Sequence, residues 1–347
     1  MIRVGIVGVG FMGWIHWLAY RKLRGMQVAA ICTRNNRRLT GDWRGIQGNF
    51  GPPGEQVDLG CIARYDQLND LLADDRVDLV DITLPTSRHA DVAIRALEAG
   101  KHVLCEKPMA LKLADCRRMV AAARKIKRQL FVAHVLPFFP EYQWARKVID
   151  GGKYGRLRGG AFRRVIANPP WMKDFWSPDH IGGPMLDLHV HDAHFIRLLF
   201  GMPAEVTTTG RVRNGLPEFW HSQFRFADRD LVVEATSGTV DQPGRAFEHG
   251  FEIHFERATI AFQFAVIGGE ARYLLEPTLL DNRGRVQRPK LRGGDPVDAF
   301  TAELREVAEC LRAGRPSPIL GAELAQDAMR ICEKQATSLL RGKPVRI

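Results

Sequence analysis

The first 134 residues alternate between short apolar runs and longer amphipathic stretches. The apolar runs predict strands that are buried on both faces, at residues 2–9, 28–32, 79–84, 102–105 and 130–134. Amphipathic stretches between them predict helices at residues 15–23, 90–99 and 113–127. Strands that alternate with helices are typical of a doubly wound α/β domain built on a parallel sheet.

The remainder of the chain follows a different pattern, in which apolar and polar positions tend to alternate with a period of two. This alternation, together with β-branched and aromatic residues, predicts strands at residues 205–212, 222–226, 231–236 and 251–255. A chain of 347 residues also suits two domains better than one. We therefore expect an N-terminal domain over residues 1–134 and a C-terminal domain over residues 135–347.

Composition and charge limit the classes of function. Hydrophobic residues make up 45% of the chain and charged residues 26%, as in ordinary globular proteins. The formal net charge is +11, but the arginines are spread along the chain and form no basic stripe with interleaved aromatics, which argues against nucleic-acid binding. We expect no secretory leader and no membrane span, and the six cysteines include no C-x-x-C pair. We expect a soluble, cytoplasmic protein whose positive charge attracts anionic ligands.

The first strand runs directly into the glycine motif Gly8-Val9-Gly10-Phe11-Met12-Gly13, and a helix follows. Gly8 permits a tight turn, Gly10 lets the backbone approach a pyrophosphate, and Gly13 lets the helix pack closely on the strand. The helix N-terminus then presents backbone N–H groups to the phosphates. A glycine motif between a strand and a helix predicts a dinucleotide-binding domain.

The end of the second strand bears on which dinucleotide is bound. NAD-binding domains usually carry an acidic residue there, which accepts hydrogen bonds from the adenosine ribose. This chain has Thr33 and Arg34 instead, and an arginine could pair with a 2′-phosphate. The cofactor is therefore expected to be NAD(P), with a preference for NADP; the alternative is that Arg34 only stacks on adenine and the cofactor is NAD.

A second motif, Glu106-Lys107-Pro108, ends the strand at 102–105, at the sheet edge where ligands bind in open α/β sheets. With both motifs in place, the chain resembles the Gfo/Idh/MocA family of sugar and cyclitol oxidoreductases. The resemblance also covers the segment 182–192 and the closing segment 300–345. It implies a second α/β domain with a large, mostly antiparallel sheet, which often serves oligomerisation, so a homodimer or homotetramer is expected.

The expected cofactor contacts lie on the turns that follow the strands of the first domain. They are Gly8, Gly10, Phe11, Met12, Gly13, Thr33, Arg34, Leu84, His89, Glu106 and Lys107. A segment rich in glycine and proline, residues 41–60, follows the second strand on the adenosine side. Its composition predicts a long loop and leaves open whether that loop is functional or mobile.

Oxidation of a secondary alcohol needs a base for the hydroxyl proton, and histidine suits this role. Asp187 and His191 are four residues apart, which on a helix places a carboxylate and an imidazole on one face. The family resemblance implies that His191 is the acid/base, that Asp187 orients it, and that Lys107 binds the reacting hydroxyl. The plain structural alternative is a capping aspartate and a core histidine.

Residues near this segment are candidates for substrate contact, because sugar sites combine aromatic platforms with polar groups. The candidates are His134, Arg164, Trp171, Trp176 and His189. His189 and His194 stand where the family more often has glycine and aspartate. His191 and His194 could both face a metal ion, but we prefer the reading without a metal.

The sequence thus predicts hydride transfer between a nicotinamide cofactor and a sugar, cyclitol or glycoside. A redox-assisted glycosidase or lyase with a retained, recycled NAD would use the same residues and is the first alternative. A non-catalytic regulator on the same fold is the second, but it predicts loss of Lys107 or of the Asp187/His191 pair, and all three residues are present.

Overall fold

The computed structural model describes residues 1–170, 172–291 and 293–347. It divides into two compact units, Met1–Phe139 with Gly293–Gln326, and Pro140–Arg292 with Asp327–Ile347. The chain first passes from one unit to the other after Phe139, close to the expected boundary at residue 134. The structure differs from the expectation in returning the segment 293–326 to the first unit, because the helix Pro296–Ala313 packs against the helix Phe11–Arg21.

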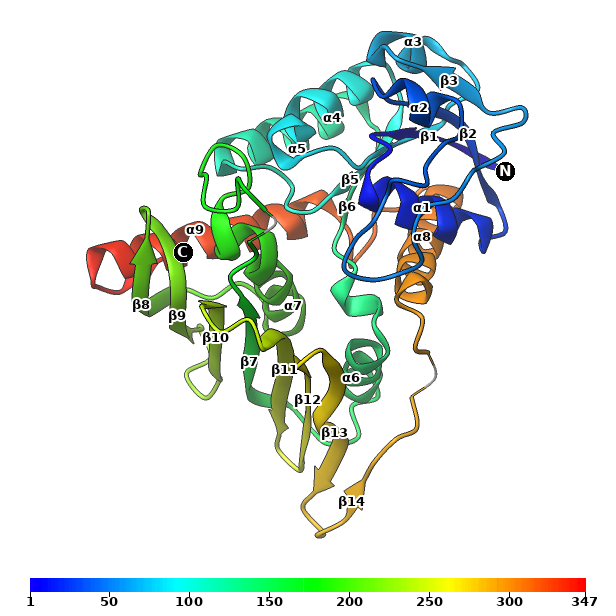
Figure 1. The fold of residues 1–347 in the computed structure, drawn as a ribbon. Coiled ribbons are helices and arrows are strands. Elements are labelled where there is room, and N and C mark those ends of the chain that lie inside the picture. The colour runs from blue at the N-terminus through cyan, green and yellow to red at the C-terminus, as the bar shows by residue number, and fades with distance from the viewer. Residues whose placement is uncertain (171, 292) are drawn as a thin grey trace. The chain divides into compact units, whose positions relative to one another are not determined.

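The described part of the first unit contains a six-stranded parallel sheet in the order β3-β2-β1-β4-β5-β6. Figure 1 labels β1, β2, β3, β5 and β6 of this sheet. The strands are β1 Ile2–Val7, β2 Met26–Cys32, β3 Ala63–Tyr65, β4 Leu79–Ile82, β5 His102–Glu106 and β6 Leu130–Ala133. The helices are α1 Phe11–Arg21, α2 Asn36–Leu39, α3 Leu68–Ala73, α4 His89–Glu98, α5 Leu113–Ile126 and α8 Pro296–Ala313, with 3₁₀ turns at Thr86–Arg88 and Leu136–Phe138. This order confirms the predicted doubly wound α/β sheet.

The described part of the second unit contains a nine-stranded sheet in the order β14-β13-β12-β11-β7-β10-β9-β8-β15. β7 and β10 pair in parallel and the other neighbours pair antiparallel, as expected. The strands are β7 Leu157–Ala167, β8 Glu205–Arg213, β9 Leu216–Arg225, β10 Val232–Val240, β11 Arg245–Phe255, β12 Ala258–Ile267, β13 Glu270–Asp281, β14 Val286–Gln287 and β15 Val345–Arg346. The helices are α6 Pro140–Asp150, the π-helical turn Met185–His189, α7 Val190–Phe200 and α9 Ala322–Arg341, whose last part belongs to this unit.

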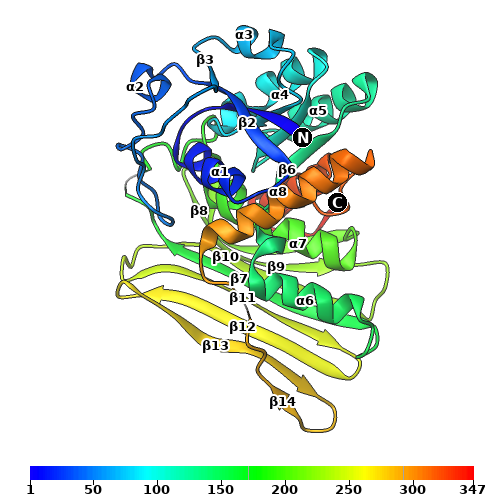
Figure 2. The same cartoon turned by 90° about the vertical axis from the view of Figure 1, so that its right-hand side faces the viewer.

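One face of the nine-stranded sheet is covered by helices of its own unit, among them α6 and α7 (Figure 2). The strands send a row of large apolar side chains into this layer, including Phe162, Trp220, Phe251 and Phe262, each at most 3% exposed. Burial of aromatic side chains on this scale is the main stabilising term for such a layer. None of the described helices combines the length and the apolar character that crossing a bilayer requires.

The loop at residues 41–60 is held to the first unit by aromatic side chains. Trp43 is 1% exposed and makes edge-to-face contacts with Trp14 and Trp17 of α1, with ring centroids 5.9 and 5.0 Å apart. Phe50 stacks on Phe300 of α8, with a centroid distance of 5.6 Å. The sequence left open whether this loop is functional or mobile. In the structure Trp43 is part of the core and Phe50 is half-buried against α8, so the loop is packed onto the first unit.

Replacing Trp43 by alanine should therefore destabilise the whole first unit. Removing a fully buried tryptophan leaves a cavity and typically costs about 3–5 kcal/mol. The free energy of unfolding from urea titration is the measurement. Arg44→Ala, at the exposed neighbour whose guanidinium pairs with Asp42 two residues away, is the control and should change stability by less than about 0.5 kcal/mol. Equal stabilities for the two variants would contradict this role of the loop.

Candidate active site

The glycine motif has the geometry that dinucleotide binding requires. Gly8 has φ +102°, and a Cβ there would lie 2.9 Å from the carbonyl oxygen of Thr83. A Cβ on Gly13 would lie 2.3 Å from the carbonyl oxygen of Gly8, so only glycine allows α1 to approach β1 this closely. Around Gly10, in contrast, a Cβ would meet nothing within 4 Å. The three glycines therefore fit the turn, the approach of a ligand and the helix contact that were predicted for them.

The same loop can hold the diphosphate of a dinucleotide. Gly10 immediately precedes α1, whose first-turn N–H groups have no partner within the helix. The side chains of Phe11 and Met12 are half-buried at this helix start. Backbone donors, a helix N-terminus and open space at Gly10 together suit a phosphate group, so the residues present fit the cofactor that the motif implies.

The end of β2 offers a basic surface on the adenosine side. Arg34 is exposed, and the hydroxyl of Thr33 accepts a hydrogen bond from the backbone N–H of Asn35. Asn35 caps α2, and the guanidinium of Arg38 donates to the backbone carbonyl of Val9 in the glycine loop. Arg38 therefore ties α2 to the glycine loop, whereas the Arg34 side chain is at the surface.

The segment Glu106-Lys107-Pro108 follows β5 at the same carboxyl edge of the sheet as the glycine loop. Lys107 is half-buried, and its backbone N–H donates to Oε2 of Glu106 at 3.0 Å. The peptide bond between Lys107 and Pro108 is cis. His89 lies with its ring nitrogens 2.9 Å from the carbonyl of Pro108 and 2.8 Å from that of Leu84, so its ring links this segment to the turn after β4. Burial lowers the pKa of His89.

A cluster of buried polar side chains lies behind this segment, between α1, β4, β5 and α8. Nδ1 of His16 is 2.8 Å from Oδ2 of Asp81, and its Nε2 is 3.0 Å from Oε1 of Glu106. The hydroxyl of Tyr20 donates to the same Asp81 oxygen at 2.9 Å. The fifth member, Glu303 of α8, is fully buried, and its carboxyl oxygens have no hydrogen-bond partner among the residues that the structure describes.

The charge states in this cluster follow from its neighbours. Burial disfavours a charged His16, but the two carboxylates outweigh it and raise the pKa of the ring well above 6.5. Burial, with the nearby charge of Glu106, raises the pKa of Glu303 well above its usual value, so this carboxyl keeps its proton to a higher pH than an exposed glutamate does. Glu106 was expected to contact the cofactor, but both of its oxygens are engaged within the protein by His16 and the Lys107 backbone.

The second unit presents Asp187 and His191 on one continuous helical segment. Asp187 lies in the π-helical turn Met185–His189, and His191 lies in the first turn of α7. Both side chains are half-buried, whereas His189, Asp192 and His194 on the same segment are buried completely. Single π-turns within helices are frequent at functional sites. Asp187 and His191 are thus polar groups of this segment that a ligand can reach.

Arg164 is engaged inside the second unit. Its guanidinium donates to both carboxylate oxygens of Asp192, from Nε at 2.7 Å and from Nη2 at 3.0 Å. Arg164 is only 4% exposed and Asp192 only 1%. A bidentate, buried pair of this kind joins β7 to α7. The geometry gives no support for the predicted contact between Arg164 and a substrate.

His189 is also engaged on both sides of its ring. Nδ1 lies 2.8 Å from Oγ of Ser237, and Nε2 lies 3.0 Å from the side-chain carbonyl of Gln335. Burial lowers the pKa of His189 to about 4, so the ring is neutral, with Nε2 donating to Gln335. His189 therefore connects the helical segment to β10 and α9, and we do not include it among the proposed substrate contacts.

Three predicted substrate residues remain, Trp176, His134 and Trp171. Trp176 is half-buried; its Nε1 donates to Oδ1 of Asn168 at 2.9 Å, and the guanidinium of Arg213 lies 5.1 Å from its ring centre. His134 is buried directly after β6, in the first unit. Trp171 lies outside the described residues. Trp176 therefore stays a candidate platform for a sugar ring.

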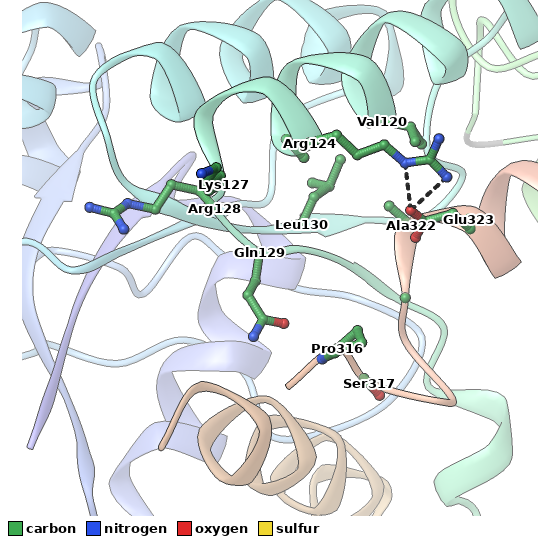
Figure 3. A pocket seen from close by; sticks show the side chains of 12 residues that line it. Val120, Arg124, Lys127, Arg128, Gln129, Leu130, Pro316, Ser317, Ala322 and Glu323 are labelled. Carbon is green, nitrogen blue, oxygen red and sulfur yellow. Dashed lines mark hydrogen bonds and ion pairs between the residues drawn. The ribbon is translucent and has the colours of Figure 1, made fainter. Parts of the chain in front are cut away.

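A hollow of about 210 Å³ elsewhere in the first unit does not belong to this chemistry. It lies beside the end of α5 and the start of β6, and Arg124 on its wall pairs with Glu323 at 3.2 Å (Figure 3). The start of β6 is at the amino edge of the parallel sheet, whereas the glycine loop and Lys107 lie at its carboxyl edge.

Within the described residues, no three side chains of the kinds that ligate metals are grouped as a metal site requires.

Sequence reasoning missed the polar cluster around His16. Two signals were present. Asp81 is a carboxylate within an otherwise apolar central strand, and His16 is a polar residue on the most buried part of α1. Buried charges are almost always paired, so each of these residues indicated a partner. The identity of the partner depends on contacts between distant segments, which no local pattern specifies.

Two family profiles match the chain. The profile described as "Oxidoreductase family, NAD-binding Rossmann fold" matches residues 2–134. The profile described as "GFO/IDH/MocA C-terminal domain" matches residues 142–261. The first match spans nearly all of the segment 1–134, and the second lies within the segment 135–347.

Characterised relatives share about a third of their residues with this chain over most of its length. An inositol 2-dehydrogenase from Salmonella typhimurium is 31% identical over 336 residues, which cover 91% of this chain and 87% of that protein. The scyllo-inositol 2-dehydrogenase (NAD⁺) of Bacillus subtilis is 29% identical over 313 residues, or 84% of this chain and 85% of that protein. Among solved structures, levoglucosan dehydrogenase in complex with NADH superposes with a TM-score of 0.80 at 20% identity, covering 100% of this chain and 99% of the other, which supports the fold alone.

The raised pKa of the Glu303 carboxyl predicts a specific dependence of stability on pH. Because the pKa of Glu303 is raised in the folded state, the folded protein keeps a proton that the unfolded chain loses near pH 4.5. Stability must then fall as the pH rises above about 4.5, towards the pKa of the folded state. The raised pKa of His16 acts in the same direction above about pH 6.5.

Glu303→Gln, which needs no proton to be neutral, should therefore lose less stability than the wild type between pH 5 and pH 8. A difference of about 1 kcal/mol or more is expected, measured by urea unfolding at each pH. Glu309→Gln on the exposed side of the same helix is the matched control and should follow the wild-type curve. If Glu303→Gln also followed the wild-type curve, the pKa of Glu303 would not be raised in the folded protein.

Proposed function

The chain belongs to the Gfo/Idh/MocA family of oxidoreductases, and on this premise we propose that it transfers a hydride between NAD(P) and a secondary alcohol or ketone of a sugar, cyclitol or glycoside. The observation that carries the proposal is the arrangement of the parallel sheet. Open backbone at Gly10 and the half-buried Lys107 both lie at its carboxyl edge, where open α/β sheets bind ligands.

Each proposed residue has one role in the reaction. The His191 imidazole takes the proton of the reacting hydroxyl and returns it in the reverse direction. Asp187, four residues before it, orients the ring and stabilises its protonated form. The Lys107 ammonium donates a hydrogen bond to the reacting oxygen. When bound at the glycine loop, the nicotinamide cofactor supplies the acceptor or donor of the hydride.

The names of the relatives narrow the substrates to test first. Two of them act on inositols, and the structural neighbour acts on levoglucosan, an anhydro sugar. All of these are polyols with secondary hydroxyl groups on a six-membered ring. We propose that this chain takes a ring polyol of the same class, with Trp176 as one platform for its C–H face.

For the cofactor, we propose a preference for NADP over NAD. Arg34 is exposed at the end of β2, and its neighbour Thr33 brings no negative charge. A guanidinium there can form a charge-assisted pair with a 2′-phosphate, which a carboxylate at the same place would repel. The cofactors named for similar proteins differ: one relative is named for NAD⁺, one neighbour is solved with NADH and another is named as NADPH-dependent, so the proposed preference rests on these two residues of this chain.

For the assembly, we propose a homodimer or homotetramer formed through the second unit. The face of its sheet opposite to α6 and α7 carries exposed apolar side chains, including Val232, Leu275 and Leu280, at 63%, 43% and 43% exposed. Exposed apolar groups on a broad sheet are typical of an association surface.

Single replacements at the proposed site test the chemistry. His191→Ala and Lys107→Ala should each lower turnover about 10²- to 10⁴-fold, because a proton acceptor or a hydrogen bond to the reacting oxygen is removed. The measurement is NAD(P)H formation at 340 nm with a panel of inositols, anhydro sugars and aldoses. His221→Ala, at an exposed histidine of the second unit, is the control and should keep turnover within about twofold. Wild-type rates in His191→Ala would remove that residue from the mechanism.

The same assay separates net oxidation from a redox-assisted glycosidase. Net oxidation produces one NAD(P)H for each molecule of ketone. A glycosidase with a retained cofactor would cleave a glycoside without net NAD(P)H. Cleavage without accumulation of NAD(P)H would therefore overturn the proposed dehydrogenase.

Arg34→Asp tests the cofactor preference. Exchange of the guanidinium for a carboxylate should weaken NADP binding at least tenfold and leave NAD binding unchanged or stronger, because it replaces an attraction to the 2′-phosphate by a repulsion. Dissociation constants from calorimetry with each cofactor are the measurement. Arg229→Asp, at an exposed position of the second unit, makes the same change in net charge and should affect neither constant. If Arg34→Asp bound NADP as tightly as the wild type, the preference would have another origin.

A further inference from the structure

His16 connects three elements of the first unit that are distant in sequence. It lies on α1, three residues after Gly13, and its two ring nitrogens contact Asp81 of β4 and Glu106 of β5. All three side chains are at most 5% exposed. Because Glu106 directly precedes Lys107, the His16 ring contacts the residue next to the proposed anchor of the reacting hydroxyl.

The surroundings of the His16 ring determine its protonation. An ionised carboxylate has only acceptor sites, so a ring nitrogen that faces one must donate. Both ring nitrogens face carboxylates, at 2.8 and 3.0 Å, and a neutral imidazole can donate from only one. The geometry therefore favours an imidazolium with two charge-assisted hydrogen bonds. Such bonds are shorter and stronger than neutral ones, and they fix the orientation of both partners.

The fixed orientation of Glu106 is passed on to Lys107. With Oε1 engaged by His16, Oε2 of Glu106 accepts the backbone N–H of Lys107 at 3.0 Å. On the other side, the His89 ring contacts the carbonyl of Pro108 at 2.9 Å. The Lys107 amide is thus held by the side chain of the preceding residue, Glu106, and the carbonyl of the following residue, Pro108, is contacted by His89 of α4.

We propose that His16 is a positioning residue, which holds Glu106 so that the backbone of Lys107, and with it the ammonium group, keeps one orientation towards the substrate. The part of this inference that concerns substrate rests on the function proposed above. The part that concerns the Lys107 backbone rests on hydrogen bonds within the first unit alone.

A purely stabilising role for the cluster makes a different prediction. Tyr20 and His16 bind the same oxygen of Asp81, but Tyr20 has no contact with Glu106 that the described hydrogen bonds show. If the cluster only stabilised the fold, loss of either partner of Asp81 would affect Lys107 in the same way. If His16 positions Glu106, the two losses should differ. Tyr20→Phe is therefore the matched control for His16→Gln.

A third variant allows for the case that His16→Gln fails to fold. Glutamine would leave two carboxylates without a cation in a buried site, which is strongly unfavourable. The double variant His16→Gln/Asp81→Asn removes one positive and one negative charge together, so the net charge of the cluster is unchanged. It still breaks the charged link from the ring to Glu106, and it is the decisive variant.

The first readout is hydrogen exchange of the Lys107 backbone amide in the full chain without substrate, measured by NMR. In the double variant, exchange at Lys107 should accelerate at least tenfold more than exchange at the central strand β1, which reports global stability. In Tyr20→Phe, both rates should change by the same factor. Equal changes at Lys107 and β1 in the double variant would overturn the positioning role.

The second readout is steady-state kinetics with the substrate that the wild type turns over fastest. The double variant should lower kcat about 10- to 100-fold and leave the dissociation constant of the cofactor within about threefold, because the glycine loop is untouched. Tyr20→Phe should keep kcat within about twofold. A wild type without activity on any ring polyol would refute the proposed function, and the exchange measurement would still decide whether His16 positions Lys107.

Discussion

The close approach of α1 to the carboxyl ends of β1 and β4 is the constraint on which the first unit depends. Gly13 lies so close to the carbonyl of Gly8 that a methyl group added at Gly13 would force α1 away from β1. This contact sets the start of α1, where backbone N–H groups can meet a diphosphate. The same contact brings His16, one turn further along, to Asp81 and Glu106. Cofactor binding and the anchoring of Lys107 therefore depend on the same helix position.

The polar side chains of the second unit differ in how deeply they are buried. Arg164, His189 and Asp192 are buried, and each is engaged with partners in the same unit. Asp187 and His191 lie on the same helical segment but are half-buried. A buried polar group must be satisfied by the protein itself, so the groups available to a ligand are those left at the surface of the segment. This separation distinguishes the four polar residues Asp187, His189, His191 and Asp192, which lie within six positions of the chain.

The sequence predicted those parts that depend on neighbouring residues. The glycine motif and five of the six described strands between residues 2 and 134 were predicted, because tight turns and buried strands have local signatures; the short strand β3, Ala63–Tyr65, was missed. The return of α8 to the first unit and the cluster of His16, Asp81 and Glu303 were not predicted, since they join segments more than 60 residues apart. Arg164 and His189 were chosen as substrate contacts by residue type, and only their hydrogen bonds in the fold showed how they are engaged.

The surface position of Arg34 has a consequence for how the enzyme can change over time. Other residues after β2 stabilise the local structure: Asn35 caps α2, Arg38 contacts Val9, and Trp43 lies in the core. Arg34 can therefore be exchanged with little effect on folding, whereas Thr33 also accepts the backbone N–H of Asn35. With the proposed role of Arg34 in the choice of nucleotide, selection could change that choice at one surface position without an intervening unstable form.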